Sequence, residues 1–282
     1  MIRERFAPSP TGLLHLGHAF SALTAWDAAG HDPNQFLLRI EDIDGPRCRP
    51  EFETQIFDDL TWLGIQWNTP VMRQSERMGA YQSALQNLDR MGLIYPCNCT
   101  RKDIETALSA RQEGDRSYQV YPGTCHHKTM ADFKNGDAIR LNMERAVAQI
   151  PQVGYIEIGD GLPKTITTSA EDLVTKTGDI VLARKDIKTS YHLAVVVDDA
   201  AQFISHVTRG QDMANQTPIH VLLQHLLGFE TPIYRHHRLI RDDQGKRLAK
   251  RHDALALKTL RSDGWTPKDI RAHLDFDKIP AG

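Results

Sequence analysis

The sequence predicts an α/β protein in which helices cover a mainly parallel β-sheet. A short strand at residues 5–6 and an apolar strand at 35–40 are separated by an Ala- and Leu-rich helix at 17–29. Two segments with helical periodicity follow, at 51–63 and 76–91. Strands that alternate with helices of this length are typical of parallel sheets.

This alternation stops at Cys97 and resumes after about Lys134. The residues between them are polar, contain Pro, Gly and three cysteines, and include one helical piece near 102–112, so we expect an insertion here. Regular α/β segments then return at 138–143, 179–184 and 191–200, followed by a helix at 217–228 and a short helix at 266–274.

Composition indicates a well-buried globular protein. The chain has 282 residues, of which 40% are apolar and 25% charged. Its apolar runs, such as 193–197, are far shorter than the roughly 18 residues that span a bilayer. Arg3, Glu4 and Arg5 do not fit a signal peptide. We therefore expect a cytoplasmic protein with no membrane partner.

Net charge excludes a protein that binds nucleic acid through a global positive field. The formal charge is −2, from 34 basic and 36 acidic residues. Basic residues gather locally in 235–251, which carries seven Lys or Arg against two Asp. This window is either a contact for a polyanion or a solvated basic loop.

Two histidines three residues apart lie where the first loop meets the first helix, in the stretch "HLGH". His15 and His18 can share one face, Gly17 lets a ligand approach the backbone, and the helix N-terminus offers N–H donors to an anion. The alternative is a structural helix cap with an incidental histidine. A metal site fits less well, because no carboxylate or cysteine is close in the sequence.

A second basic motif, "GKRLAKRHDA" at 245–254, can close on a polyphosphate. Together, "HLGH" and "RLAKR" resemble the HIGH and KMSKS motifs of class I aminoacyl-tRNA synthetases. The stretches "RFAPSPTGLLHLGHA", "FLLRIEDID", "AVVVDDA" and "HVTRGQDMANQTP" are similar to the glutamyl-tRNA synthetase group. The resemblance covers residues 5 to about 255. It implies a Rossmann-like parallel sheet and activation of glutamate with ATP and Mg²⁺.

The chain ends some 30 residues after "RLAKR", which resembles the truncated paralogue family, the glutamyl-queuosine tRNA(Asp) synthetases. We expect no anticodon-binding domain and a short helical C-terminal region. The resemblance implies four parts: the first half of the catalytic domain at 1–95, a small zinc-binding insertion at 96–134, the second half at 135–228, and the KMSKS-like loop with the C-terminal helices at 229–282.

Three cysteines crowded into one segment resemble metal ligands more than a disulfide scaffold. The paralogue family holds zinc with C-x-C followed by Y-x-x-x-C, a pattern that implies four ligands here: Cys97, Cys99, Tyr121 and Cys125. His126 and His127 are alternative fourth ligands, and free thiols are the remaining alternative. Cys48 stands apart from the group.

The resemblance also implies the residues of the active site. Residues that contact glutamate are expected at Arg5, Phe6, Ala7, Pro8, Ser9, Glu41, Tyr191 and Arg209. Residues that contact ATP are expected at His15, Gly17, His18, Arg247 and Lys250, of which His15, His18 and Lys250 are catalytic. Two of these residues have other interpretations from sequence alone: Glu41 as a surface partner of Arg39, and Arg209 as a solvated charge.

The motif departs from the family pattern at two positions. Arg247 stands where a lysine is usual, and Ala249 replaces the usual serine, which removes one hydroxyl from the loop. We expect a slower reaction rather than a lost one.

The acceptor that the resemblance implies is queuosine in the anticodon stem-loop of tRNA(Asp). Our default expectation for the oligomeric state is a monomer. Three alternatives remain: a synthetase that charges tRNA(Glu), an inactive homologue that binds RNA, and a nucleotidylyltransferase that acts on a small molecule.

Overall fold

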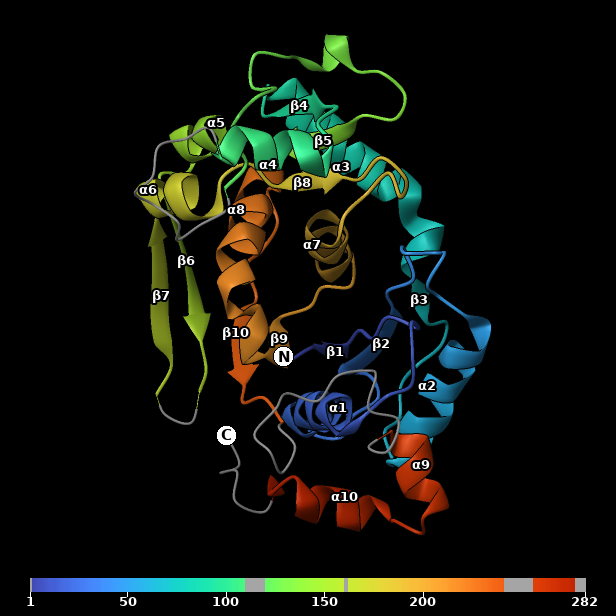
Figure 1. Ribbon diagram of the computed structural model, residues 1–282. Helices are drawn as coiled ribbons and strands as arrows, with labels where there is room; N and C mark the ends of the chain where they lie inside the picture. The colour runs from blue at the N-terminus through green and yellow to red at the C-terminus, as the bar shows by residue number, and fades with distance from the viewer. Residues whose placement is uncertain (1, 110–119, 160–161, 241–255, 277–282) are drawn as a thin grey trace.

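The centre of the fold consists of two sets of parallel strands (Figure 1). The structure is a computed structural model that describes residues 2–109, 120–159, 162–240 and 256–276. In the first set, β2 (Phe36–Ile40) lies between β1 (Glu4–Phe6) and β3 (Met72–Arg73). In the second set, β10 (Ile233–His237) lies between β9 (His206–Gly210) and β6 (Gln152–Glu157). The predicted parallel α/β arrangement is thus confirmed.

The two sets meet where β1 lies beside β9. The backbone oxygen of Arg3 accepts hydrogen bonds from the N–H groups of Ser205 and His206, at 3.0 and 3.1 Å. The carboxylate of Glu4 accepts from the hydroxyl and the N–H of Thr208. These contacts hold β1 alongside β9, with β2 and β10 on either side. Near the carboxyl end of β1, Arg5 Nη1 donates to the backbone oxygen of Thr208 at 3.4 Å, so the carboxyl ends of the two strands lie close together. In open α/β sheets, ligands bind at such ends.

Helix α1 (Leu16–Ala28) connects β1 to β2 and packs on the first set of strands (Figure 1). Its buried face includes Phe20 and Trp26, which belong to the same core as β1 and β2. The C-terminal helices, α9 (Leu257–Ser262) and α10 (Pro267–His273), complete this core. The predicted short helix at 266–274 is therefore present.

A larger core lies under the second set of strands. It is formed mainly by α3, α7 and α8 with β6 and β10. The bounds of these helices, together with α2 on the first core, are Pro50–Trp62 (α2), Met78–Arg90 (α3), Tyr191–Ala201 (α7) and Thr217–Leu227 (α8). The apolar run at 191–200 forms helix α7, and its residues 193–199 are buried because the helix packs against α3, α8 and the strand at 181–183.

Two parts of the structure are antiparallel, which the parallel pattern did not predict. A three-stranded sheet joins β4 (Ile94–Cys97), β5 (Ala138–Leu141) and β8 (Val181–Ala183) at the top of Figure 1. A hairpin pairs β6 with β7 (Lys164–Ser169). The remaining elements are η1 (Gln74–Arg77), α4 (Arg101–Ser109), η2 (Met130–Asp132), α5 (Met143–Gln149), α6 (Ala170–Asp172), η3 (Leu173–Thr177) and η4 (Gln211–Gln216).

Across the described ranges, no helix has both the length and the apolar composition that crossing a bilayer requires. The predicted division into four parts stays a prediction.

A buried carboxylate fixes α7 against α3. Asp198 is fully buried and accepts hydrogen bonds from Arg77 at 2.6 Å, Tyr81 at 2.7 Å and Gln74 at 3.0 Å. Gln74 and Arg77 belong to η1, and Tyr81 belongs to α3, which follows η1 directly. Because Asp198 lies next to Asp199 in the sequence, this contact also fixes the position of the neighbouring carboxylate.

We expect Asp198→Ala to lower the free energy of unfolding by about 3–5 kcal/mol, because it leaves a guanidinium without its buried partner. Urea denaturation measures this change. The control is Asp172→Ala, which breaks an exposed pair with Lys176 and should change stability by less than ~1 kcal/mol. Equal effects of the two substitutions would contradict the assignment.

Candidate functional site

Buried charges meet at the carboxyl ends of β1 and β2. Asp199 Oδ1 accepts from Arg5 Nε at 3.2 Å and from Arg39 Nη1 at 2.7 Å. Arg39 Nη2 also donates to Glu41 Oε1 at 3.1 Å. One aspartate from α7 therefore holds two guanidinium groups from neighbouring strands, and the second of these holds Glu41.

Burial determines the electrostatics of this cluster. Burial alone would raise the pKa of Asp199, but Arg5 and Arg39 outweigh it and lower that pKa. The pKa of Glu41 is raised, because burial is the larger effect there. Glu41 does pair with Arg39, yet both side chains are buried, so the interpretation as a surface pair is wrong.

Arg209 at the end of β9 is held by neutral groups. It donates from Nη1 to His220 Nδ1 at 3.1 Å and to Tyr191 Oη at 3.4 Å. It also donates from Nη2 to Thr217 Oγ1 at 2.5 Å and from Nε to His236 Nε2 at 3.3 Å. The side chain is 7% exposed, so the interpretation as a solvated charge is wrong.

Tyr191 lies between these two groups. Its hydroxyl accepts from Arg209, and burial raises its pKa while Arg209 and Arg5 oppose the rise. The structure thus brings Arg5, Glu41, Tyr191 and Arg209 into one region. Two cations and a carboxylate in a buried setting can bind a molecule that carries two carboxylates and an ammonium group.

The segment after β1 crosses the end of β2. Phe6 and Pro8 are buried, whereas Ala7 and Ser9 are half-buried. The N–H of Glu41 donates to the backbone oxygen of Pro8 at 3.0 Å. This bond holds the segment beside Glu41, where the sequence predicted a substrate contact.

The two histidines form the N-terminus of α1. His15 caps the helix: its Nδ1 accepts from Gly17 N at 3.1 Å, and His18 Nδ1 accepts from His15 N at 3.2 Å. The interpretation as a helix cap is therefore confirmed for His15. Because both Nδ1 atoms accept, each neutral ring carries its proton on Nε2 and can donate there. The ring centroids are 3.9 Å apart.

The cap leaves little space for a side chain at position 17. A Cβ at Gly17 would lie 3.0 Å from His15 Cε1 and 3.1 Å from His15 Nδ1. A larger residue at position 17 would therefore require the His15 ring to move by a few tenths of an ångström.

The chain returns to this helix terminus from far along the sequence. His15 pairs with Ala256 in an antiparallel bridge, and Leu257 N donates to Leu14 O at 2.9 Å. Arg247 and Lys250, predicted to contact ATP, lie outside the described residues. In the sequence, Ala256 follows Lys250 by six residues, and it lies beside His15.

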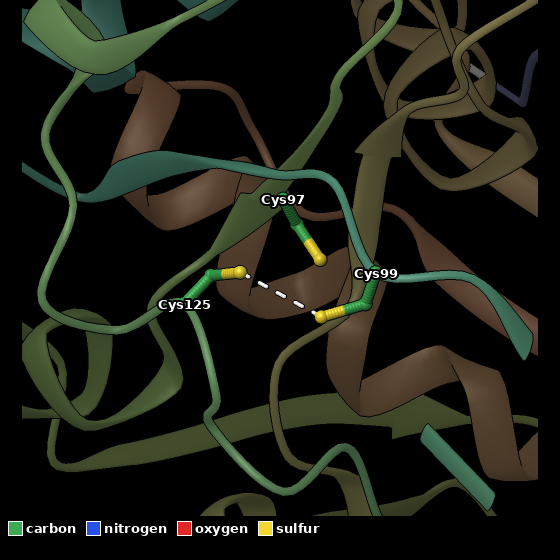
Figure 2. Close-up of side chains that lie close together, drawn as sticks. All are labelled: Cys97, Cys99 and Cys125. Carbon is green, nitrogen blue, oxygen red and sulfur yellow. Dashed lines mark hydrogen bonds between the residues drawn. The ribbon is translucent and has the colours of Figure 1, made fainter. Parts of the chain in front are cut away.

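Three thiols lie together beside the end of β4 (Figure 2). The sulfur atoms of Cys97, Cys99 and Cys125 all lie within 4.8 Å of one another, and those of Cys99 and Cys125 are 3.6 Å apart. The Tyr121 hydroxyl lies 3.3 Å from Cys97 Sγ and 3.4 Å from Cys99 Sγ. In a tetrahedral zinc site, ligand atoms are separated by about 3.5–3.8 Å. This group could hold a metal ion.

The surroundings favour Tyr121 over His126 as a fourth ligand. His126 contacts Asp179 through Nε2, and Asp179 also accepts from Tyr95. His127 is exposed. The ring of Tyr121 is held by Arg140, whose guanidinium carbon lies 3.8 Å from the ring centroid.

Several residues of the site were missed by the sequence analysis. They are Arg39, Asp199, His220 and His236. A signal existed only for Asp199: two adjacent aspartates inside an apolar run indicate buried charges that need partners.

Solved structures with a similar fold include aminoacyl-tRNA synthetases. A methionyl-tRNA synthetase from Mycobacterium tuberculosis bound by methionyl-adenylate matches 97% of the chain with a TM-score of 0.58 at 10% identity, which shows the fold alone. The glutamate-tRNA synthetase of Elizabethkingia anophelis matches 94% of the chain with a TM-score of 0.69 at 26% identity. The chain spans about half (54%) of that protein.

The family model described as "tRNA synthetases class I (E and Q), catalytic domain" matches residues 1–275, and the chain belongs to this family of ligases. A Rhodobacter capsulatus relative named "Glutamyl-Q tRNA(Asp) synthetase" is 50% identical over 95% of the chain and 97% of its own length. A Nitratidesulfovibrio vulgaris protein of the same name is 38% identical over 97% of the chain and 85% of its own length. The predicted resemblance is confirmed.

The imidazoles around Arg209 predict a loss of stability in acid. Burial lowers the pKa of His192, which lies 3.1 Å from His220, to about 4. Between that pH and the ordinary value near 6.5, only the unfolded chain binds the proton, so stability falls as the pH is lowered.

We expect His192 to contribute about 2 kcal/mol to the loss of unfolding free energy between pH 7 and pH 5. In His192→Asn, urea denaturation at the two pH values should give a difference smaller by that amount. His225→Asn, on the exposed side of α8, should keep the full difference. An unchanged difference in His192→Asn would show that the imidazole is not held neutral.

Proposed function

We propose that this chain activates L-glutamate with ATP and transfers it to queuosine in the anticodon of tRNA(Asp). The main support is the buried guanidinium of Arg209. It makes no ion pair with a carboxylate within the described ranges, so its charge is available to a ligand. The names of the relatives from R. capsulatus and N. vulgaris agree with this assignment.

Recognition of glutamate follows from the charges of the site. Arg209 pairs with one carboxylate of the substrate, and Arg5 orients the other across the Tyr191 hydroxyl. Glu41 accepts from the α-ammonium group with the oxygen that Arg39 does not use. Phe6, Ala7, Pro8 and Ser9 form the adjoining wall.

Activation is an in-line attack by the α-carboxylate on the α-phosphate of ATP, so positioning and charge stabilisation carry the catalysis. His15 and His18 donate to phosphate oxygens from Nε2, beside the N–H groups at the start of α1. Gly17 allows the phosphate to approach. Arg247 and Lys250 follow the negative charge onto the leaving pyrophosphate, and Mg²⁺ enters with ATP as part of the substrate.

The metal that we propose for the cysteine group is zinc, in a structural role. Cys97, Cys99 and Cys125 supply three thiolates and Tyr121 supplies an oxygen, a closed donor set without a position for substrate. A zinc ion held by these residues would have a structural role, because it would link the end of β4 to the segment around Cys125.

The first test is glutamate-dependent ATP–pyrophosphate exchange without any tRNA. We expect exchange by the unmodified protein, and a decrease of about 10²–10³-fold in Lys250→Ala, since one donor to the transition-state charge is lost. The exposed Lys258→Ala on α9 is the matched control and should retain exchange. Near-normal exchange in Lys250→Ala would refute the role of that lysine.

The acceptor is tested by transfer of labelled glutamate. A monomeric enzyme with the proposed activity charges queuosine-containing tRNA(Asp) and leaves both tRNA(Glu) and queuosine-free tRNA(Asp) unlabelled. Charging of tRNA(Glu) would instead identify a glutamyl-tRNA synthetase. Labelling of no RNA, without exchange, would identify an inactive homologue.

Metal analysis tests the zinc site by itself. We expect one equivalent of zinc per chain, retained in His126→Ala and lost in Cys97→Ala, because the thiolates provide most of the binding energy. Tyr121→Phe should bind zinc more weakly than His126→Ala does. A stable, fully folded protein without metal would overturn the assignment.

A further inference from the structure

Arg209 differs from the other buried arginines of the site in the kind of partner that holds it. Arg5 and Arg39 contact the carboxylate of Asp199, which neutralises part of their charge. The four acceptors around Arg209 are two imidazole nitrogens and two hydroxyl oxygens, none of which carries a formal charge.

The tautomers of both imidazoles follow from this contact. An arginine has only N–H donors, so each ring nitrogen that faces it must be an acceptor. His220 therefore accepts at Nδ1 and carries its proton on Nε2, which donates to His192 Nδ1 at 3.1 Å. His236 accepts at Nε2 and carries its proton on Nδ1, which lies 3.2 Å from Glu157 Oε1.

The two imidazole rings accept hydrogen bonds from different nitrogen atoms of the Arg209 guanidinium group. His236, from β10, faces Nε, whereas His220, from α8, faces Nη1. Thr217 accepts from Nη2 and lies 2.9 Å from His236 Nε2, so its hydroxyl donates there. The plane of the guanidinium is thereby fixed from two elements of secondary structure.

We propose that His220 and His236 are positioning residues that orient Arg209 as neutral acceptors and leave its positive charge for the side-chain carboxylate of the substrate. This inference rests on the proposed activation of glutamate. According to this proposal, the two imidazole rings are the reason why the site selects glutamate over its uncharged amide, glutamine. A carboxylate in their place would neutralise Arg209 and remove that selection.

The test replaces each histidine by Asn or Gln, which place their side-chain oxygen at different ring positions. Asn places its side-chain oxygen near Nδ1 of a histidine, and Gln places its oxygen near Nε2. We therefore expect His220→Asn and His236→Gln to keep the KM for glutamate within about threefold. His220→Gln and His236→Asn should raise that KM about ten- to hundredfold, because a bond from a charged donor is lost.

Other readouts separate positioning from general damage. The kcat and the KM for ATP should change less than about threefold in all four variants, since neither ring contacts the histidines of the "HLGH" stretch. The preference for glutamate over glutamine should fall only in the two variants with the raised KM. His225→Gln, on the exposed side of the same helix, is the control and should behave as the unmodified protein.

Direct calorimetric titration with glutamate distinguishes failure of this inference from failure of the proposed function. If the unmodified protein binds glutamate but catalyses no ATP–pyrophosphate exchange, the proposed activity is wrong. The Kd values of the four variants for glutamate then still test whether His220 and His236 orient Arg209. Equal KM or Kd values within each Asn and Gln pair would overturn it. An unmodified protein that binds no glutamate would overturn both.

Discussion

The site depends on one interaction: the carboxylate of Asp199 between the guanidinium groups of Arg5 and Arg39. The three residues come from α7, β1 and β2, so the contact joins α7 to the first set of strands. Two buried cations side by side would be strongly unfavourable without this anion. Because Arg39 also donates to Glu41, the same aspartate helps to determine where the carboxylate of Glu41 lies.

Arg209 is also a buried cation, but it is held by neutral acceptors and not by a carboxylate. Neutral acceptors satisfy its N–H groups and leave its charge in place, an arrangement suited to a ligand carboxylate. The site therefore combines Arg5, whose charge is partly neutralised by Asp199, with Arg209, which is held by neutral acceptors. For the proposed activation of glutamate, this difference gives a physical basis for selecting an acidic amino acid.

Local sequence patterns predicted the elements whose residues are close in the chain. Helices α1 and α8 lie within one or two residues of the predicted ranges, because their periodicity and their Gly and Pro boundaries are local. The antiparallel sheet of β4, β5 and β8 was not predicted, since strand pairing joins residues far apart in the chain, such as Ile94 with Leu141 and Ile139 with Ala183. The run at 191–200 is a helix buried on both faces, a case that periodicity does not distinguish from a strand.

The sequence by itself determined the chemistry that is written in short motifs: the histidine pair at the start of a helix, the clustered cysteines with a tyrosine, and the arginines expected to bind carboxylates. Only the tertiary structure decided how these groups act. Arg5 and Asp199 are 194 residues apart, and His220 and His236 reach Arg209 from a helix and a strand. The protonation of a buried group depends on the partners and the burial that folding supplies, and neither can be read from its neighbours in the chain.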